Sequence, residues 1–260
     1  MKKTLLFWSG LIAIGVITGC CMTIVPRTQQ HDHNIVNDMQ SSTVAFVSKG
    51  LGSGVVGVYC SGVWIAKDKI LTADHCARAE IEHKLKISAE SGPSHLSIVR
   101  LIEADYIISF ITNNDSLGFQ REPAIVRLAV VKKFDFEHDL AILVIKDDES
   151  IPDHEIANLA EQSPDVGEEI HLMGHPLGLS WTYGHGYVAA YREEQFIASI
   201  NKLGPWLQGS VPGWHGNSGG GVFNSEGNLV GIASFIVPAP NTLMFVHIAT
   251  IKNFLNRNVL

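Results

Sequence analysis

From Ser41 onward, the apolar residues occur in short segments separated by Gly, Asp and Asn. Those three residues favour tight turns, and segments of about four to eight apolar or alternating residues between turns are typical of strands. The chain holds 24 glycines, and only 17% of its residues are charged. The sequence therefore predicts an all-β fold, a sandwich or a barrel. The expected strands are residues 43–47, 62–66, 69–72, 98–102, 124–130, 141–145, 169–173, 229–234 and 244–248.

A single helix is expected, over residues 250–256 near the C-terminus. Hydrophobic residues make up 46% of the chain, which favours a packed core over a disordered chain. The formal net charge is −7. Because duplex binding relies on clustered Lys and Arg, nucleic acid is excluded as an expected partner.

The start of the chain carries an export signal. Two lysines precede an apolar run over residues 5–17, and small residues and Cys20 follow it. The sequence Ile-Thr-Gly-Cys ending at Cys20 resembles the bacterial lipobox, which predicts removal of residues 1–19 and lipidation of Cys20. In the alternative, the apolar segment continues to Val25 and forms an uncleaved membrane anchor. Both interpretations place the rest of the chain outside the cytoplasm, at the membrane of a bacterial cell envelope.

The residues after this signal are polar and lack an apolar period. We expect residues 20–40 to form a tether and residues 41–260 to form the folded domain. His31 and His33 lie in the tether without further ligand residues nearby, so no metal site is expected there.

Three local stretches carry the residue types of nucleophilic catalysis. They are Leu-Thr-Ala-Asp-His-Cys around His75, His-Asp-Leu-Ala around Asp139, and Gly-Asn-Ser-Gly-Gly around Ser218. A serine hydroxyl is a poor nucleophile until an imidazole takes its proton, and the imidazole needs a carboxylate to fix its tautomer. Glycines let the backbone N–H groups, here those of Gly216 and Ser218, point at a developing oxyanion. The three stretches together predict a catalytic triad.

Four further stretches, together with these three motifs, resemble the pattern of one protein family. They are Cys-Ser-Gly-Val-Trp-Ile from Cys60, the stretch 167–179, the segment 229–234 after the serine loop, and Phe-Val-His-Ile at 245–248. With the three motifs above, these stretches make residues 41–255 resemble the chymotrypsin-fold serine peptidases, in particular the HtrA-type bacterial members.

The resemblance implies two six-stranded Greek-key β-barrels packed together, over about residues 41–155 and 156–260, with a short C-terminal helix. It also implies a serine endopeptidase that hydrolyses peptide bonds in protein or peptide substrates through an acyl-enzyme. Its triad is then His75, Asp139 and Ser218. No cofactor is expected.

The resemblance further implies a disulfide between Cys60 and Cys76, which bracket the strand leading to His75. An oxidising compartment permits this pairing, and two reduced buried thiols are the alternative. The residue before the histidine is usually Ala in the family, but here it is Asp74, which adds a charge beside the base.

The residues expected to bind substrate are Pro212, Ser234, Phe235 and Ile236. Pro212 stands where trypsin-like members place the Asp that selects Arg or Lys, and an unpaired buried cation is costly. Ile236 stands where open-pocket members carry Gly and should narrow the pocket. Ala233 stands where glutamyl endopeptidases typically have a histidine. We therefore expect cleavage after small or medium apolar residues such as Ala, Val or Leu.

The sequence leaves open both the function and the role of one segment. The alternative function is a catalytically silent surface lipoprotein that uses the protease fold as a binding module. Residues 107–120, between the candidate His and Asp, are either an extra surface loop or a partner site. HtrA-type proteins usually carry a PDZ domain after the protease, and because few residues follow the terminal helix we expect a stand-alone enzyme.

Overall fold

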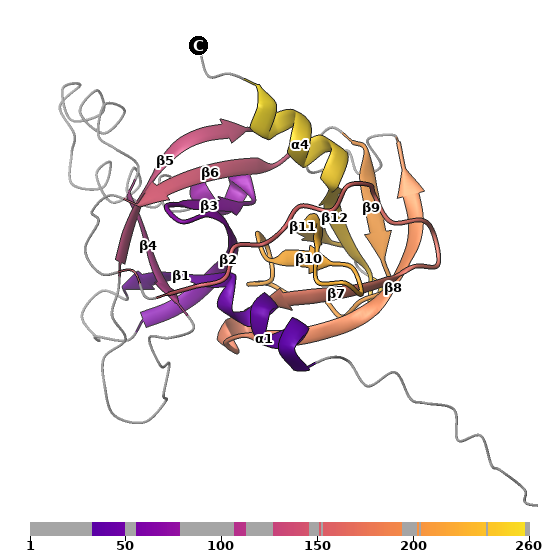
Figure 1. The fold of residues 1–260 in the computed structure, drawn as a ribbon, viewed down its shortest axis with the longest axis horizontal. Coiled ribbons are helices and arrows are strands. Elements are labelled where there is room, and N and C mark those ends of the chain that lie inside the picture. Colours follow the sequence, from indigo (N-terminus) through magenta and orange to yellow (C-terminus); the bar gives the residue numbers. More distant parts are fainter. Residues whose placement is uncertain are drawn as a thin grey trace, which may run out of the picture. The chain divides into compact units, whose positions relative to one another are not determined.

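The structure is a computed structural model, and residues 32–260 form one compact unit. Its ribbon in Figure 1 is mostly β and ends in a short helix, α4 (Ile248–Asn256), which confirms both expectations. The described residues are 33–49, 56–78, 107–112, 127–145, 151, 153–193, 202, 204–237 and 239–257.

The first sheet is a closed antiparallel barrel in the strand order β1-β2-β3-β6-β5-β4. Its interior holds large apolar side chains, among which Trp64 and Phe110 meet edge to face with ring centroids 5.7 Å apart. Its strands are β1 (Thr43–Lys49), β2 (Val56–Ala66), β3 (Lys69–Thr72), β4 (Ile107–Thr112), β5 (Arg127–Asp135) and β6 (Leu140–Ile145).

The second sheet has the order β10-β11-β12-β9-β8-β7, and β7 also pairs with β10, which closes it into a second barrel. The two barrels share one buried core, in which Ala45 and Leu71 of the first barrel join Leu172 and Phe245 of the second. Its strands are β7 (Glu169–Gly174), β8 (Thr182–Arg192), β9 (Trp206–Gly209), β10 (Gly221–Phe223), β11 (Leu229–Ile236) and β12 (Leu243–His247).

The structure corrects the expectation for residues 107–120. Ile107–Thr112 is strand β4, which closes the first barrel by pairing with β1 and β5. The side chain of Phe110 is fully buried there. The segment is therefore part of the barrel, and the remainder, residues 113–120, lies outside the described residues. The strand expected at 98–102 also lies outside them.

The expected tether is wrong for residues 33–40, because His33–Ser41 form helix α1. Ile35 and Val36 pack against the shared core, and Met39 is only 2% exposed. These residues lie on one face of a helical turn, so the short segment gains its stability by packing on the domain. The rest of the expected tether and the export signal lie outside the described residues.

No helix among the residues that the structure describes is long and apolar enough to cross a membrane.

The expected site residues lie at the ends of strands. His75 is on a helical turn, residues 74–78, that follows β3, and Asp139 directly precedes β6. Ser218 lies in the loop before β10, and Ser234 is on β11. The fold thus brings together residues from both barrels.

Candidate active site

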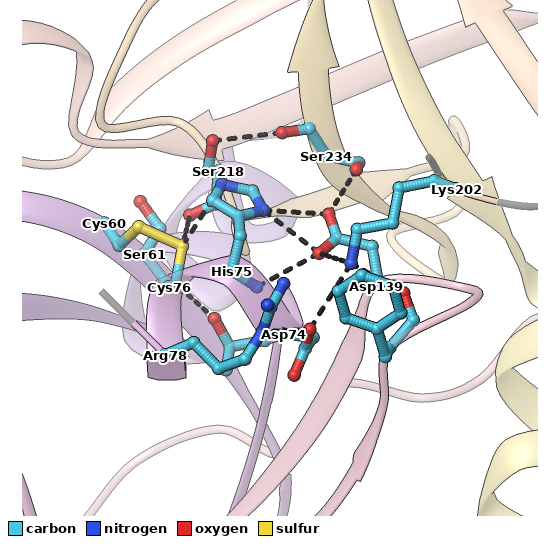
Figure 2. A network of polar contacts seen from close by, with 12 residues as sticks. Cys60, Ser61, Asp74, His75, Cys76, Arg78, Asp139, Lys202, Ser218 and Ser234 are labelled. Carbon is cyan, nitrogen blue, oxygen red and sulfur yellow. Dashed lines mark hydrogen bonds and ion pairs between the residues drawn. A yellow bond between two sulfur atoms is a disulfide. The ribbon is translucent and has the colours of Figure 1, made fainter. Parts of the chain in front are cut away.

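His75 and Asp139 form a direct pair, as Figure 2 shows. Nδ1 of His75 lies 2.9 Å from Oδ2 of Asp139 and 3.1 Å from Oδ1. The backbone N–H of His75 also donates to Oδ1, at 3.0 Å. Asp139 is buried, whereas the imidazole is partly exposed. The carboxylate therefore fixes both the position and the tautomer of the ring, leaving Nε2 as the nitrogen that can accept a proton.

Asp139 is held by two more groups. The Ser234 hydroxyl donates to Oδ2, and the Lys202 ammonium lies 3.3 Å from Oδ1. Burial alone would raise the pKa of this carboxyl, but the hydrogen bond and charge of His75, the Lys202 charge and the Ser234 hydrogen bond outweigh burial and lower it. Asp139 is therefore ionised at neutral pH.

The hydroxyl of Ser218 donates to the backbone carbonyl of Ser234, at 3.1 Å, instead of to His75. The two residues are nevertheless neighbours, because Sγ of Cys76 lies 3.8 Å from Nε2 of His75 and 3.5 Å from the Ser218 carbonyl. His75, Asp139, Ser218 and Ser234 all line one cavity of about 430 Å³. The structure thus gathers the three expected residues at one site.

Glycines shape the loop that carries Ser218. Gly216 has φ +100°, and a Cβ there would lie 2.2 Å from the His175 carbonyl. Gly219 has φ +81°, and a Cβ there would lie 2.1 Å from the Ser61 carbonyl. Both positions exclude any other residue, by conformation and by contact.

A neighbouring turn orients the peptide bond before Gly216. The N–H of Leu177, in the short helix η2 (Pro176–Gly178), donates to the His215 carbonyl at 2.8 Å. Because the carbonyl and N–H of a trans peptide point in opposite directions, the Gly216 N–H points away from Leu177.

A buried hydrogen-bonded chain supports the same loop from below. Ser61 Oγ lies 2.7 Å from the Gly216 carbonyl and 2.8 Å from Nδ1 of His175. A carbonyl only accepts, so the single hydroxyl proton goes to Gly216, and Nδ1–H of His175 donates to Ser61. This order places a proton on Nδ1 of His175, and burial keeps the ring neutral by lowering the pKa of His175 to about 3.

Cys60 and Cys76 form a disulfide, as expected. Together with His75 they place three ligand-type atoms within 4.8 Å, the one such group among the described residues. Two of these atoms are disulfide sulfurs, which offer no thiolate, so the group does not fit a metal ion.

A second cavity, of about 780 Å³, adjoins the first. Pro212 and Ile236 line it, and Trp214 and Ile236 line both cavities. Ser234 and Phe235 line the first cavity only. None of the lining residues described for the second cavity is charged.

Three residues of the site are not among those expected from the sequence. Lys202 contacts Asp139 and Asp74, while Ser61 and His175 support the serine loop. Ser61 stands inside the Cys-Ser-Gly stretch, which offered a weak signal. Lys202 belongs to no motif, so nothing in the sequence points to it.

Fold and site together define the class: a two-barrel chymotrypsin-type fold with a His–Asp pair and a serine in a glycine loop. Residues 60–232 match the trypsin-like peptidase domain family, so the chain belongs to that family.

The relatives in sequence are distant. The chain is 35% identical over 116 residues to a "probable periplasmic serine endoprotease DegP-like" of Hahella chejuensis, which covers 44% of this chain and 23% of the relative. It is 29% identical over 132 residues to the mouse "serine protease HTRA4", covering 50% of this chain and 26% of the relative. The chain thus spans about a quarter of the length of these relatives.

Solved structures share the fold. The inactive form of Rv3671c from M. tuberculosis superposes with a TM-score of 0.59 at 14% identity, covering 88% of this chain and 95% of that one. A serine endoprotease from Yersinia pestis gives a TM-score of 0.56 at 20% identity, covering 85% and 64%.

The buried His175 predicts how stability depends on pH. An unfolded histidine takes up a proton below about pH 6.5, while native His175 stays neutral until about pH 3. Its contribution to stability is therefore fully present above pH 6.5 and is lost as the pH falls, by about 1.4 kcal/mol per pH unit. We expect the free energy of unfolding of His175→Gln to fall less steeply with decreasing pH than that of the wild type, between about pH 6.5 and pH 4.5.

Urea unfolding at a series of pH values measures these slopes. His33→Gln, at an exposed histidine of α1, is the control and should keep the wild-type slope. The same slope in His175→Gln as in the wild type would contradict the neutral, buried assignment.

Proposed function

We propose that the chain is a serine endopeptidase with Ser218 as nucleophile, His75 as general base and Asp139 as the residue that orients the base. One observation carries this proposal: the paired His75 and Asp139 line the same cavity as Ser218. The relatives described as serine proteases support it.

The proposed reaction follows from the positions of the atoms. The Ser218 hydroxyl leaves the Ser234 carbonyl by rotation about its Cα–Cβ bond and attacks the substrate carbonyl while Nε2 of His75 takes its proton. The oxyanion that forms accepts hydrogen bonds from the N–H groups of Gly216 and Ser218. The protonated imidazole then donates to the leaving amine, which yields the acyl-enzyme, and water hydrolyses the ester by the reverse sequence.

A second candidate function rests on the orientation of Ser218. Since its hydroxyl donates to Ser234 and not to His75, the fold is also compatible with a catalytically silent binding module. In the peptidase, Ser218 reacts with an electrophile that needs an activated hydroxyl, whereas in the binding module it does not.

Active-site labelling distinguishes them. We expect a fluorophosphonate probe to label the full-length chain made in an oxidising compartment, and to leave Ser218→Ala unlabelled. His75→Ala and Asp139→Asn should react at least about 10³-fold more slowly, because the base is absent or held in the wrong tautomer. Circular dichroism of each variant controls for folding. Absence of label on the folded wild type would reject the enzyme and favour the binding module.

For specificity, we propose that the second cavity receives the side chain before the scissile bond and that small or medium apolar residues fit it. Its described lining carries no charge that could pair with Arg, Lys or Glu. Ile236 lines this cavity, and its branched side chain limits the size of the residue that fits there.

Substrate profiling tests this assignment with a peptide library. We expect Ala, Val or Leu to dominate before the cleaved bond. Ile236→Gly should raise kcat/KM for Phe relative to Val by about 10-fold or more, because removal of the branched side chain opens the cavity. The exposed Val166 offers the control, Val166→Ala, which should keep the wild-type profile. A library dominated by Arg or Glu refutes the proposal.

For location, we propose that the chain is exported and held at the membrane through a lipid on Cys20. The support is the signal sequence, and the relative from Hahella chejuensis is described as periplasmic. The alternative is an uncleaved anchor that extends to Val25.

Mass spectrometry of the mature chain separates these alternatives. We expect residues 1–19 to be absent and Cys20 to carry a diacylglyceryl group, and Cys20→Ala to abolish the lipid. A mature protein that keeps Met1 contradicts lipidation and indicates the anchor.

A further inference from the structure

Lys202 occupies an unusual place for a lysine. It is only 6% exposed, and its ammonium lies 3.3 Å from Oδ1 of Asp139 and 3.3 Å from Oδ2 of Asp74. Figure 2 shows its side chain reaching between the two carboxylates. Lysine is almost never buried unless it is paired, and here it bridges two buried acids.

A third partner completes the surroundings of the ammonium. Lys202 donates to the Phe136 carbonyl at 2.6 Å, and its Nζ lies 4.2 Å from the centroid of the Phe136 ring. The ammonium therefore donates hydrogen bonds to Phe136 and Asp74 and forms an ion pair with Asp139. Phe136 belongs to the β5–β6 turn that also carries Asp139, so Lys202 holds this turn at two points.

Asp74 depends on the same lysine. Its side chain is fully buried, and Oδ2 accepts from Nε of Arg78 at 2.7 Å and from Lys202. A buried carboxylate without such partners would be strongly destabilising. Although Asp74 precedes His75 in the sequence, Figure 2 shows its carboxylate directed toward Arg78 and Lys202.

Lys202 also acts on the carboxylate that orients the imidazole. On Asp139, Oδ1 accepts from the backbone N–H of His75 and faces Lys202, while Oδ2 faces Nδ1 and accepts from Ser234. The lysine therefore restrains the rotation of the carboxylate and adds a positive charge behind it.

We propose that Lys202 is a positioning residue of the catalytic site, which orients Asp139 and, paired with Asp74, keeps the charge around His75 balanced. This inference rests on the proposed serine peptidase function. Ion pairs connect two carboxylates, Asp74 and Asp139, with two cations, Arg78 and Lys202, and their formal charges cancel. The nearby Asp135 is paired with His138 and Arg257 and does not contact this group.

The proposal predicts opposite effects for the two members of the pair. Lys202→Met leaves a net negative charge that favours the imidazolium, so the acid limb of the pH profile of fluorophosphonate labelling moves up by about one pH unit. Asp74→Ala leaves a net positive charge, so that limb moves down by a similar amount, about one unit. The double variant Asp74→Ala/Lys202→Met restores the balance and returns the limb to within about 0.3 units of the wild type.

Two further variants, Lys202→Arg and Lys252→Met, are the controls for Lys202→Met. Lys202→Arg keeps the charge and should keep the limb near the wild-type position. Lys252 lies on α4 and donates to the Glu161 carbonyl, so Lys252→Met removes the same charge away from the site and should change nothing. If Lys202→Met does not fold, Asp74→Ala and the double variant still test the proposal, because the limb must move down in the first and return in the second.

The outcomes separate this inference from the function on which it rests. No labelling of the folded wild type rejects the proposed function. Labelling of the wild type with limbs that move in the same direction in both single variants, or with a double variant no better than Lys202→Met, overturns the role of Lys202 alone. An NMR titration of the His75 imidazole in the Ser218→Ala background reports the same shifts without any need for activity.

Discussion

The site depends above all on the buried carboxylate of Asp139. A buried charge is stable only where hydrogen bonds and opposite charges replace water. Here the partners come from three parts of the chain: His75 after β3, Ser234 on β11, and Lys202 between β8 and β9. Asp139 precedes β6 of the first barrel, whereas Ser234 and Lys202 belong to the second half of the chain. The carboxylate is fully paired only when both barrels have docked, so docking and assembly of the site are coupled.

The serine loop shows the same dependence from the opposite side. Ser218 is carried by the second barrel, yet Ser61 of β2 holds the loop at two points. Its N–H donates to the Ser218 carbonyl at 2.8 Å, and its hydroxyl donates to the Gly216 carbonyl. His175 keeps the hydroxyl in this direction because its own N–H occupies the other side of the oxygen. Each barrel thus fixes residues of the other, and residues of both barrels line the cavity that contains Ser218.

The sequence predicts those features of the site that depend on neighbouring residues, and it does not predict contacts between residues far apart in the chain. The loop around Ser218 could be predicted because its local backbone conformation requires glycines. Strands such as β6 and β11 could be predicted because buried strands have continuous apolar runs. Helix α1 was missed because its three apolar residues are stabilised by packing on the domain and not by helix propensity. Lys202 was missed because its contact with Asp74 spans 128 residues and leaves no local pattern.

Asp74 shows why a departure from a family pattern has to be weighed in three dimensions. Taken alone, an acid beside the histidine adds a negative charge next to the imidazole. In the structure that charge is buried, and it is stable there because Arg78 approaches from its own helical turn and Lys202 from the second half of the chain. The same lysine reaches Asp139, so the added acid and the added cation offset each other at the imidazole. The pair therefore leaves the net charge around His75 as it would be with neutral residues at both positions 74 and 202, while supplying Asp139 with one more fixed contact.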